Sequence, residues 1–208
     1  MNILLVDDHD IIREGLKHIL LEEFPSAGID EASTAEEAIK KISQLKFDVI
    51  LCDLTMPGRS GLDVVRQVKQ LDPKLPVLIL SMHSEDEYAV RALRAGAAGY
   101  LNKAHGTTDV IKAIQMVLQG RRYISPSTAE KMIDNFQSGL DDPPHHHLSD
   151  REFFIFKLIA EGNSVSAIAE RLSLAASTIS THRARILDKM SLKSNADLTK
   201  YALLYKLL

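Results

Sequence analysis

The sequence predicts an α/β domain with a five-stranded parallel sheet, followed by a small all-α domain. Five short apolar runs alternate with helical patterns in the first part of the chain, whereas the last part carries helical patterns alone. A length of 208 residues is comfortable for two such domains. We expect the first domain at 1–120, a linker at 121–147 and the second domain at 148–208.

The five apolar runs show little polar alternation, which is typical of strands covered by helices on both faces. They lie at 3–6, 28–32, 49–52, 77–80 and 99–101, the second being the weakest. Apolar residues at helical spacing follow them, most clearly Val110, Ile111, Ile114, Val117 and Leu118. Similar sets occupy 11–20, which begins with Ile11, and 35–42, 62–71 and 88–95. Strand and helix thus alternate five times, as in right-handed βαβ crossovers.

Polar side chains gather at the ends of four of these strands, namely Asp7, Asp8, Asp53, Ser81 and Lys103. The carboxyl ends of parallel strands meet at one edge of the sheet, so we expect these side chains to converge there. Three carboxylates in one place repel one another and favour a hard divalent cation such as Mg²⁺. Asp53 would then be able to attack phosphorus, with Lys103 and the Ser81 hydroxyl contacting the phosphoryl group.

Residues 1–120 resemble the receiver domain of two-component response regulators. The matching motifs are the Asp7-Asp8 pair, Asp-Leu-Thr-Met-Pro-Gly at 53–58, Ser81, and Gly-Tyr-Leu-Asn-Lys at 99–103. The resemblance implies a flavodoxin-like fold in which Asp53 accepts a phosphoryl group from a sensor histidine kinase. It also implies that Asp8, Asp53 and the backbone carbonyl of Thr55 bind Mg²⁺, with Asp7 helping through a water molecule.

The same resemblance makes Ser81 and Tyr100 a switch pair, in which the hydroxyl moves to the phosphoryl group and the aromatic ring rotates inward. The alternative for Tyr100 is an ordinary half-buried strand residue. The chain departs from many receivers at Ala104, where proline commonly follows the lysine. Because a non-proline cis bond costs roughly 3 kcal/mol, we expect either a trans Lys103–Ala104 bond with a differently shaped loop or a strained cis bond.

The stretch 121–147 has the turn-rich, polar composition of a linker, within which 128–136 could form a short helix. It ends in three histidines, His145, His146 and His147. Adjacent residues on a flexible segment cannot all face one metal ion well, so we expect a solvated spacer here rather than a metal site.

The segment 148–208 has the patterns of four helices. Ser149 and Glu152 have the spacing of a capping box at the start of the first helix, which Gly162 ends. Apolar residues of the other three are Ile168, Ala169 and Leu172, then Ile179, Ile186, Leu187 and Met190 within 177–190, then Leu198, Ala202 and Leu203. A short helix, a brief turn and a helix with hydroxyl and basic residues suggest a helix-turn-helix whose second member enters the major groove of DNA.

This segment resembles the LuxR-type module of NarL/FixJ-type response regulators. The resemblance rests on Leu148-Ser-x-Arg-Glu, Ala160-Glu-Gly-x-Ser, Ile168-Ala-Glu-Arg-Leu, and Thr178-Ile-Ser-Thr-His followed by Ile186-Leu187. Phe154 stands where a second glutamate is usual, and Ser180 where a lysine is common.

Residue matching to that module implies a DNA-binding set on the third helix. In it Ser180, Thr181 and Ala184 face base edges, Arg183, Arg185 and Lys189 can reach phosphates, and Ser177 and Thr178 begin the helix. Small hydroxyls identify bases ambiguously, so these residues do not define an operator. His182 is expected to pack or to contact a phosphate rather than to bind metal. A solvated face on a protein-binding bundle is the alternative for this helix.

Charge is distributed unevenly along the chain, whose net charge is −3. Residues 1–147 hold 16 Lys and Arg against 22 Asp and Glu, whereas 148–208 hold 9 against 6. An acidic domain can hold a cation, and a basic one can meet nucleic acid. No apolar run is long enough for a membrane span and no basic region precedes the first one, so we expect a cytoplasmic protein with no membrane partner. Cys52 is expected to be a small core residue.

These observations favour a phosphorylation-switched, DNA-binding transcription regulator that is not an enzyme. DNA operators of such modules are commonly two half-sites, so a homodimer is expected after phosphorylation, through the Ile11 and Val110 helices or the last helix. One alternative is a phosphorylation-independent DNA-binding regulator with a silent receiver. Another is a Mg²⁺-dependent phosphatase of the haloacid dehalogenase kind, against which Thr55 stands where that family has a second aspartate.

Overall fold

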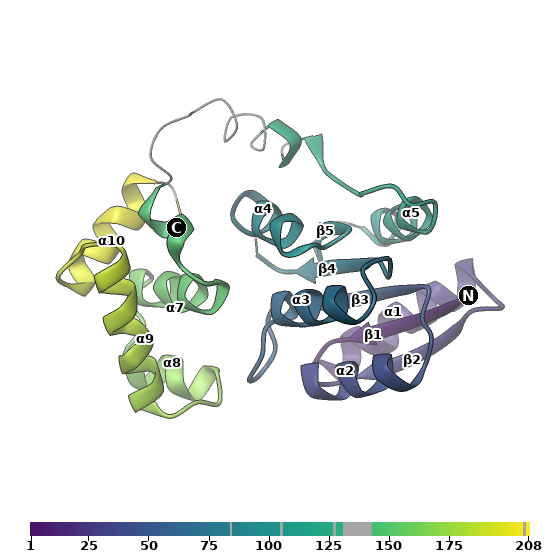
Figure 1. Ribbon diagram of the computed structural model, residues 1–208, viewed down its shortest axis with the longest axis horizontal. Coiled ribbons are helices and arrows are strands. Elements are labelled where there is room, and N and C mark those ends of the chain that lie inside the picture. Colours follow the sequence, from purple (N-terminus) through teal and green to yellow (C-terminus); the bar gives the residue numbers. More distant parts are fainter. Residues whose placement is uncertain (84, 105, 127, 131–142, 206) are drawn as a thin grey trace. The chain divides into compact units, whose positions relative to one another are not determined.

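The computed structural model describes residues 1–208 except 84, 105, 127, 131–142 and 206. The chain divides into two units, Met1–Ser138 and Gly139–Leu208, each of which is described by itself (Figure 1). Most of the short helix expected at 128–136 lies outside the described residues. No helix in the part of the chain that the structure describes is both long and apolar enough to cross a membrane.

Five strands form a parallel sheet in the first unit, which confirms the predicted fold class. They are β1 (Asn2–Val6), β2 (Gly28–Ala32), β3 (Val49–Asp53), β4 (Val77–Ser81) and β5 (Gly99–Asn102), in the order β2-β1-β3-β4-β5. The connections reverse direction between β1 and β3. In open α/β sheets this reversal leaves a crevice at the carboxyl ends of the two strands, where ligands bind. Asp7 follows β1 and Asp53 ends β3, so both flank that crevice.

The sheet is covered by α1 (Asp10–Glu23), α2 (Ala35–Gln44), α3 (Gly61–Leu71), α4 (Glu85–Ala95) and α5 (Thr107–Leu118). Leu20 of α1 and the α5 residues Val110, Ala113, Ile114 and Val117 share one core with alternate strand residues such as Ile3, Leu5 and Leu51. On the other side of the sheet, α3 contacts both α2 and α4. Right-handed crossovers require this division of the helices between the two faces.

Two residues of the predicted apolar sets lie outside this core. Ile11 is 86% exposed on the first turn of α1, and Leu118 is 41% exposed at the end of α5. The predicted helical spacing is right, but the predicted apolar sets of these helices include residues that are not buried. Only the residues that face the sheet form the buried stripe of each helix. Cys52 is buried in β3, as predicted.

The start of α3 is fitted closely beneath Asp53. Ser60 and Asp63 form a capping box, and the Gly61 amide donates to the Leu54 carbonyl at 2.9 Å. A Cβ atom on Gly61 would lie 2.2 Å from the backbone oxygen of Asp53, which no side chain tolerates. A glycine at this position therefore allows the helix to begin directly beside the crevice.

The beginning of the predicted linker packs on the first unit instead of standing free. Tyr123 bridges to Gly99 at the start of β5, and its amide donates to the Ala98 carbonyl at 2.9 Å. A Cβ on Gly99 would lie 2.8 Å from the Tyr123 oxygen, so the approach depends on the glycine. Composition indicated a linker here because backbone pairing to a distant strand leaves no local signal.

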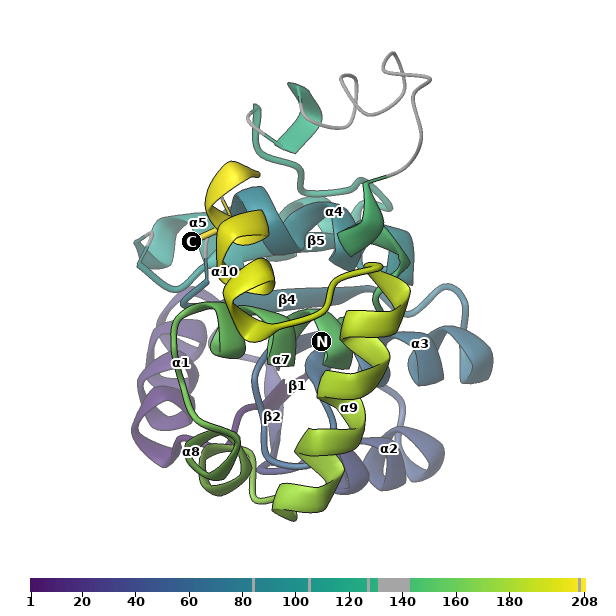
Figure 2. The same cartoon turned by 90° about the vertical axis from the view of Figure 1, so that its left-hand side faces the viewer.

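The second unit consists of the short 3-10 helix η1 (Pro144–His147) and α7 (Asp150–Ala160), α8 (Val165–Arg171), α9 (Ala176–Lys189) and α10 (Asn195–Leu204). The Ser149–Glu152 capping box is present, and Gly162 follows α7 with φ +91°. Helix α7 packs on α9 and α10, and α8 packs on α9. Figure 2 shows α8 and α9 joined by the turn of the predicted helix-turn-helix. Every helix predicted for this segment is confirmed.

The prediction of a solvated spacer at the three histidines is wrong for His145. Its side chain is buried, its Nδ1 lies 2.8 Å from the Tyr201 hydroxyl of α10, and its ring also contacts Phe153 and Tyr205. An aromatic ring gains more from packing against three other rings than from solvation. His145 thus belongs to the second unit.

Candidate functional site

Three carboxylates and an imidazole meet at the carboxyl edge of the sheet. Possible ligand atoms of Asp7, Asp8, His9 and Asp53 all lie within 4.8 Å of one another. Asp7 and Asp53 are buried, with 2% and 5% of their surfaces exposed, whereas Asp8 is more accessible. The convergence that the strand pattern predicts for the three aspartates is therefore present.

Lys103 joins two of these carboxylates. Its Nζ lies 2.6 Å from Asp7 Oδ2 and 2.7 Å from Asp53 Oδ1. Burial alone would lower the pKa of Lys103, but the neighbouring Asp53 and Asp7 carboxylates outweigh it and raise this pKa. The ammonium group therefore stays charged and partly balances the two buried carboxylates.

Asp53 is held at both of its carboxylate oxygens. Oδ1 contacts Lys103, and Oδ2 accepts a hydrogen bond of 3.2 Å from the Thr55 amide. Burial raises the pKa of Asp53 to about 6, with Lys103 opposing the rise and Asp7 and Asp8 adding to it. At pH 7 the group is mainly ionised, in the form that can act as a nucleophile.

The residues present suit a bound Mg²⁺ ion. Asp8 Oδ1 is shielded from solvent and accepts no hydrogen bond from the described residues, although the His9 Nδ1 lies 3.1 Å from it. A shielded carboxylate oxygen without a donor is costly unless a cation is near. Carboxylate oxygens beside the partly exposed Asp8 side chain match the preference of Mg²⁺ for oxygen ligands and retained water.

His9 and Arg13 belong to this site, although the sequence reasoning did not include them. The His9 Nδ1 lies 3.1 Å from Asp7 Oδ1 and 3.1 Å from Asp8 Oδ1. The backbone amide of His9 also donates a hydrogen bond to Asp7 Oδ1. Arg13 donates to the Asp7 carbonyl from the first turns of α1. The one available signal was that His9 directly follows the aspartate pair.

Ser81 and Tyr100 lie on neighbouring strands and share a contact with the loop after β4. The buried Ser81 Oγ accepts a hydrogen bond of 3.0 Å from the His83 amide. The Tyr100 hydroxyl donates to the His83 carbonyl at 3.0 Å, and Asn102 Nδ2 donates to the same oxygen. Tyr100 is 3% exposed, so it is more deeply buried than the half-buried alternative predicted. The Lys103–Ala104 bond is trans, like every described peptide bond, which selects one of the two predicted forms.

The predicted DNA-contacting residues lie along α9 with different surroundings. Ser177, Ser180, Thr181, Ala184 and Arg185 are exposed, and Thr178 and Arg183 are intermediate. Arg183 Nε donates to Asn195 Oδ1 at 2.6 Å. Lys189 Nζ lies 2.6 Å from Glu152 Oε2, whose side chain is 5% exposed, so Lys189 is engaged within the domain.

His182 is partly buried on α9. Burial lowers the pKa of its imidazole, and the positive charges of Arg151 and Arg185 lower it further. Its Nδ1 is shielded and has no hydrogen-bond partner in the described part of the chain. The ring is therefore neutral at pH 7, and both predicted roles of His182, packing and a phosphate contact, stay predictions.

Comparison with known families and proteins agrees with this geometry. Residues 3–115 match the response regulator receiver domain, and residues 146–202 match the LuxR family of bacterial regulatory proteins. The chain is 36% identical to the response regulator GacA of Pseudomonas aeruginosa over 203 residues, covering 97% of this chain and 95% of GacA. It is 33% identical to the response regulator UvrY of Escherichia coli K12, covering 98% of this chain and 94% of UvrY.

A solved structure resembles the whole chain as well. RcsB from Salmonella enterica serovar Typhimurium, bound to promoter rprA in the presence of the phosphomimetic BeF3⁻, has a TM-score of 0.62 and 25% identity, covering 97% of this chain and 98% of RcsB. The two family matches occur in the order that the motifs predicted. The chain therefore belongs to the two-component response regulators and combines a receiver domain with a LuxR-type DNA-binding domain.

Proposed function

We propose that a phosphoryl group on Asp53 switches this regulator between two states that differ in how they bind DNA. The observation that carries the proposal is the Lys103 ammonium held 2.7 Å from Asp53 Oδ1 and 2.6 Å from Asp7 Oδ2. A purely structural ion pair would not require two further carboxylates beside it. The donor is the phosphohistidine of a sensor histidine kinase, and the process takes place in the cytoplasm.

The transfer step follows from the position of Asp53. One carboxylate oxygen forms the new P–O bond while the P–N bond to the kinase histidine breaks. The bonding electron pair leaves on the imidazole nitrogen, which takes up a proton from solvent. Asp8, Asp53 and the Thr55 carbonyl would hold Mg²⁺, with Asp7 acting through water, and the ion supplies positive charge to the phosphoryl oxygens. Lys103 pairs with an oxygen of the transferred group.

The response spreads from Asp53 through Ser81 and Tyr100. A phosphoryl oxygen offers the Ser81 hydroxyl a stronger acceptor than any neutral group. Moving this hydroxyl changes its hydrogen bond with the His83 amide. The carbonyl of the same residue, His83, accepts a hydrogen bond from the Tyr100 hydroxyl. The loop after β4 therefore has a different set of partners in each state, which is the requirement for a two-state switch.

DNA binding is assigned to α9. The hydroxyl side chains Ser177, Ser180 and Thr181, which are exposed, and Thr178, which is partly exposed, would face base edges. Arg183 and Arg185 would reach phosphates, and Lys189 would do so only by leaving Glu152. RcsB, which resembles this chain, has been solved in complex with DNA and as two dimers bound to two parallel DNAs. We extend both properties to this chain as a homodimer on two half-sites.

The test is intact-mass analysis and gel filtration with Mg²⁺ and acetyl phosphate, for the wild type and Asp53→Asn. We expect a phosphoryl adduct and a shift toward dimer in the wild type alone. The variant Asp30→Asn removes a carboxylate of the same unit whose side chain is 48% exposed, and it should behave as the wild type. Without an adduct in the wild type, the silent-receiver alternative would hold.

The phosphatase alternative predicts a different outcome. A phosphatase would release inorganic phosphate continuously from generic phosphomonoesters. A regulator should release at most the phosphate of its own adduct, because Thr55 offers no carboxylate to activate the hydrolytic water. Equal DNA affinity of the wild type and Asp53→Asn at every phosphodonor concentration would contradict the switch itself.

A further inference from the structure

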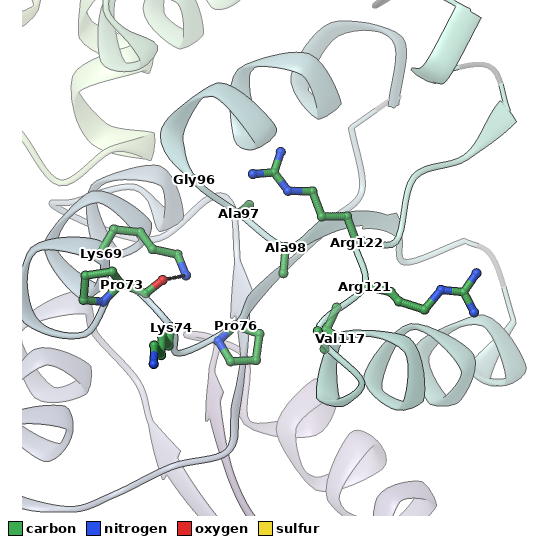
Figure 3. A pocket seen from close by; sticks show the side chains of 11 residues that line it. Lys69, Pro73, Lys74, Pro76, Gly96, Ala97, Ala98, Val117, Arg121 and Arg122 are labelled. Atoms are coloured by element: carbon green, nitrogen blue, oxygen red, sulfur yellow. Dashed lines mark hydrogen bonds between the residues drawn. The ribbon is translucent and has the colours of Figure 1, made fainter.

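The first unit contains a polar pocket at the edge of the sheet opposite Asp53. Its volume is about 300 Å³, and it lies where β4 and β5 begin (Figure 3). It is formed by the end of α3, the turn before β4, the turn before β5, and the residues after α5. Four separate segments thus enclose one hollow, and none of them contributes to the site already described.

The lining of this pocket is strongly positive. Lys69, Lys74, Arg121 and Arg122 line it, and no Asp or Glu is among its described lining residues. The first unit as a whole is acidic, with 16 Lys and Arg against 20 Asp and Glu through Ser138. A quarter of the positive residues of an acidic domain therefore meet in this one pocket.

Lys69 carries its charge in an unfavourable place. Its Nζ donates to the carbonyls of Pro73, at 3.1 Å, and Leu75, at 2.6 Å, which fixes the side chain. Burial lowers the pKa of Lys69, Asp72 opposes this by raising it, and the Arg122 guanidinium has a smaller effect that lowers it. The two positive groups repel each other across the pocket, and an anion placed between them would remove that repulsion.

The two arginines are held in place by the backbone. Gly120, with φ +77°, ends α5, and the Arg121 amide donates to the Met116 carbonyl at 3.0 Å. Two residues on, Tyr123 pairs with Gly99. Arg121 and Arg122 are thus fixed between the end of α5 and the beginning of β5. Figure 3 shows Arg122 and Lys69 extending from different walls, while the Arg121 side chain extends outward along α5.

We propose that this pocket binds a small phosphorylated molecule that carries at least two negative charges. Guanidinium and ammonium groups together are the typical partners of phosphate oxygens, and the several positive groups lining the pocket require more than one negative charge to balance them. The volume is at the lower end of the range for small-ligand sites, which suits a mononucleotide or a smaller phosphate compound. Pro73, Pro76, Ala98 and Val117 supply apolar surface for an organic part.

A bound anion would also affect the linker. It would connect Lys69 and the turn before β4 to Arg122, and so stabilise the pairing of Tyr123 with Gly99 in β5. The same strand carries Tyr100. The pocket would therefore couple a cellular phosphate compound to the segment that leads to the DNA-binding domain, independently of any phosphoryl group on Asp53.

The test is isothermal titration calorimetry of the full chain without Mg²⁺, using inorganic pyrophosphate and ADP as probes. The pocket variant is Arg121→Gln/Arg122→Gln. The control is Lys40→Gln/Lys112→Gln, which removes two exposed positive charges elsewhere in the same unit. We expect one binding site in the wild type and the control, and an affinity at least about tenfold lower in the pocket variant.

Acetyl phosphate provides the folding check, because all three proteins should form the Asp53 adduct. Failure of that adduct in every protein would concern the switch and not the pocket. The pocket proposal is overturned if the wild type binds neither probe, if the pocket variant binds as the wild type does, or if both variants weaken binding equally. It is also overturned if the pocket variant loses affinity for duplex DNA but not for pyrophosphate or ADP, which would assign these arginines to nucleic acid.

Discussion

In the first unit, Asp53 meets its partners from separate strand ends, whereas the residues proposed to contact DNA follow one another along the single helix α9. The acidic site has buried charges that compensate one another within 3 Å, as Lys103 does for Asp7 and Asp53. The residues of α9 are mostly exposed, although Arg183 pairs with Asn195 and Lys189 with Glu152 within the unit. The charges at the Asp53 site therefore affect mainly the stability of the fold, whereas the charges on α9 affect mainly the proposed association with DNA.

The largest expected effect of a single change is at Lys103. Lys103→Met should lower the free energy of unfolding by about 4 kcal/mol, because Asp7 and Asp53 would remain buried without their ammonium partner. Urea unfolding should show the loss, and Mg²⁺ should restore part of it by supplying positive charge at the same place. Lys112→Met, at an exposed position of α5, should change stability by less than about 0.5 kcal/mol. Equal stability of both variants would mean that the pair is not needed for folding.

A substitution in the apolar core of the second unit tests the stability of that unit without changing a charge. Ile186→Ala should cost about 3 kcal/mol, because Ile186 is fully buried among the helices of that unit. The Asp53 adduct with acetyl phosphate should still form, since the first unit has its own core. Leu203→Ala, at a position 63% exposed, is the control and should be nearly neutral. Loss of the adduct in Ile186→Ala would show that the two units do not fold independently.

A smaller effect is expected for metal binding. Asp8→Asn should lower Mg²⁺ affinity by about tenfold in calorimetry, because one carboxylate of the cluster loses its charge. The control is Asp10→Asn, two residues further on, where the side chain is 84% exposed and pairs with Arg13. If both variants bind Mg²⁺ equally well, Asp8 is not a ligand.

The smallest expected effects are those of substitutions on α9. They distinguish the roles of two positive residues, Arg183 and Lys189, that the sequence alone does not distinguish. Arg183→Ala should weaken DNA binding by about threefold for every sequence and reduce the slope of affinity against salt by about 1. Lys189→Ala should instead reduce stability by about 1 kcal/mol, because Glu152 would lose its partner. An unchanged salt slope in Arg183→Ala would exclude a phosphate contact. A reduced slope in Lys189→Ala would show that this lysine leaves Glu152 to reach DNA.

Periodicity and strand-end polarity were sufficient to predict the architecture of both units. The alternation of apolar runs with helical patterns is local information, and it defined all five strands, their parallel arrangement and the helices of the second unit. The meeting of Asp7, Asp53 and Lys103 followed from the same pattern, because parallel strands bring their carboxyl ends to one edge. Capping at Ser149 was also predictable, since it depends on residues three positions apart.

The remaining features were decided by tertiary structure, because they join residues that no local pattern links. The contacts of His145 with Tyr201, of Lys189 with Glu152 and of Tyr123 with Gly99 bring together positions at least 24 residues apart. Periodicity identifies the apolar face of a helix but not which residues of that face meet the sheet, so Ile11 was misplaced. The basic pocket is the clearest case, because its four positive residues line one hollow only when α3, α5 and the beginnings of β4 and β5 are packed together.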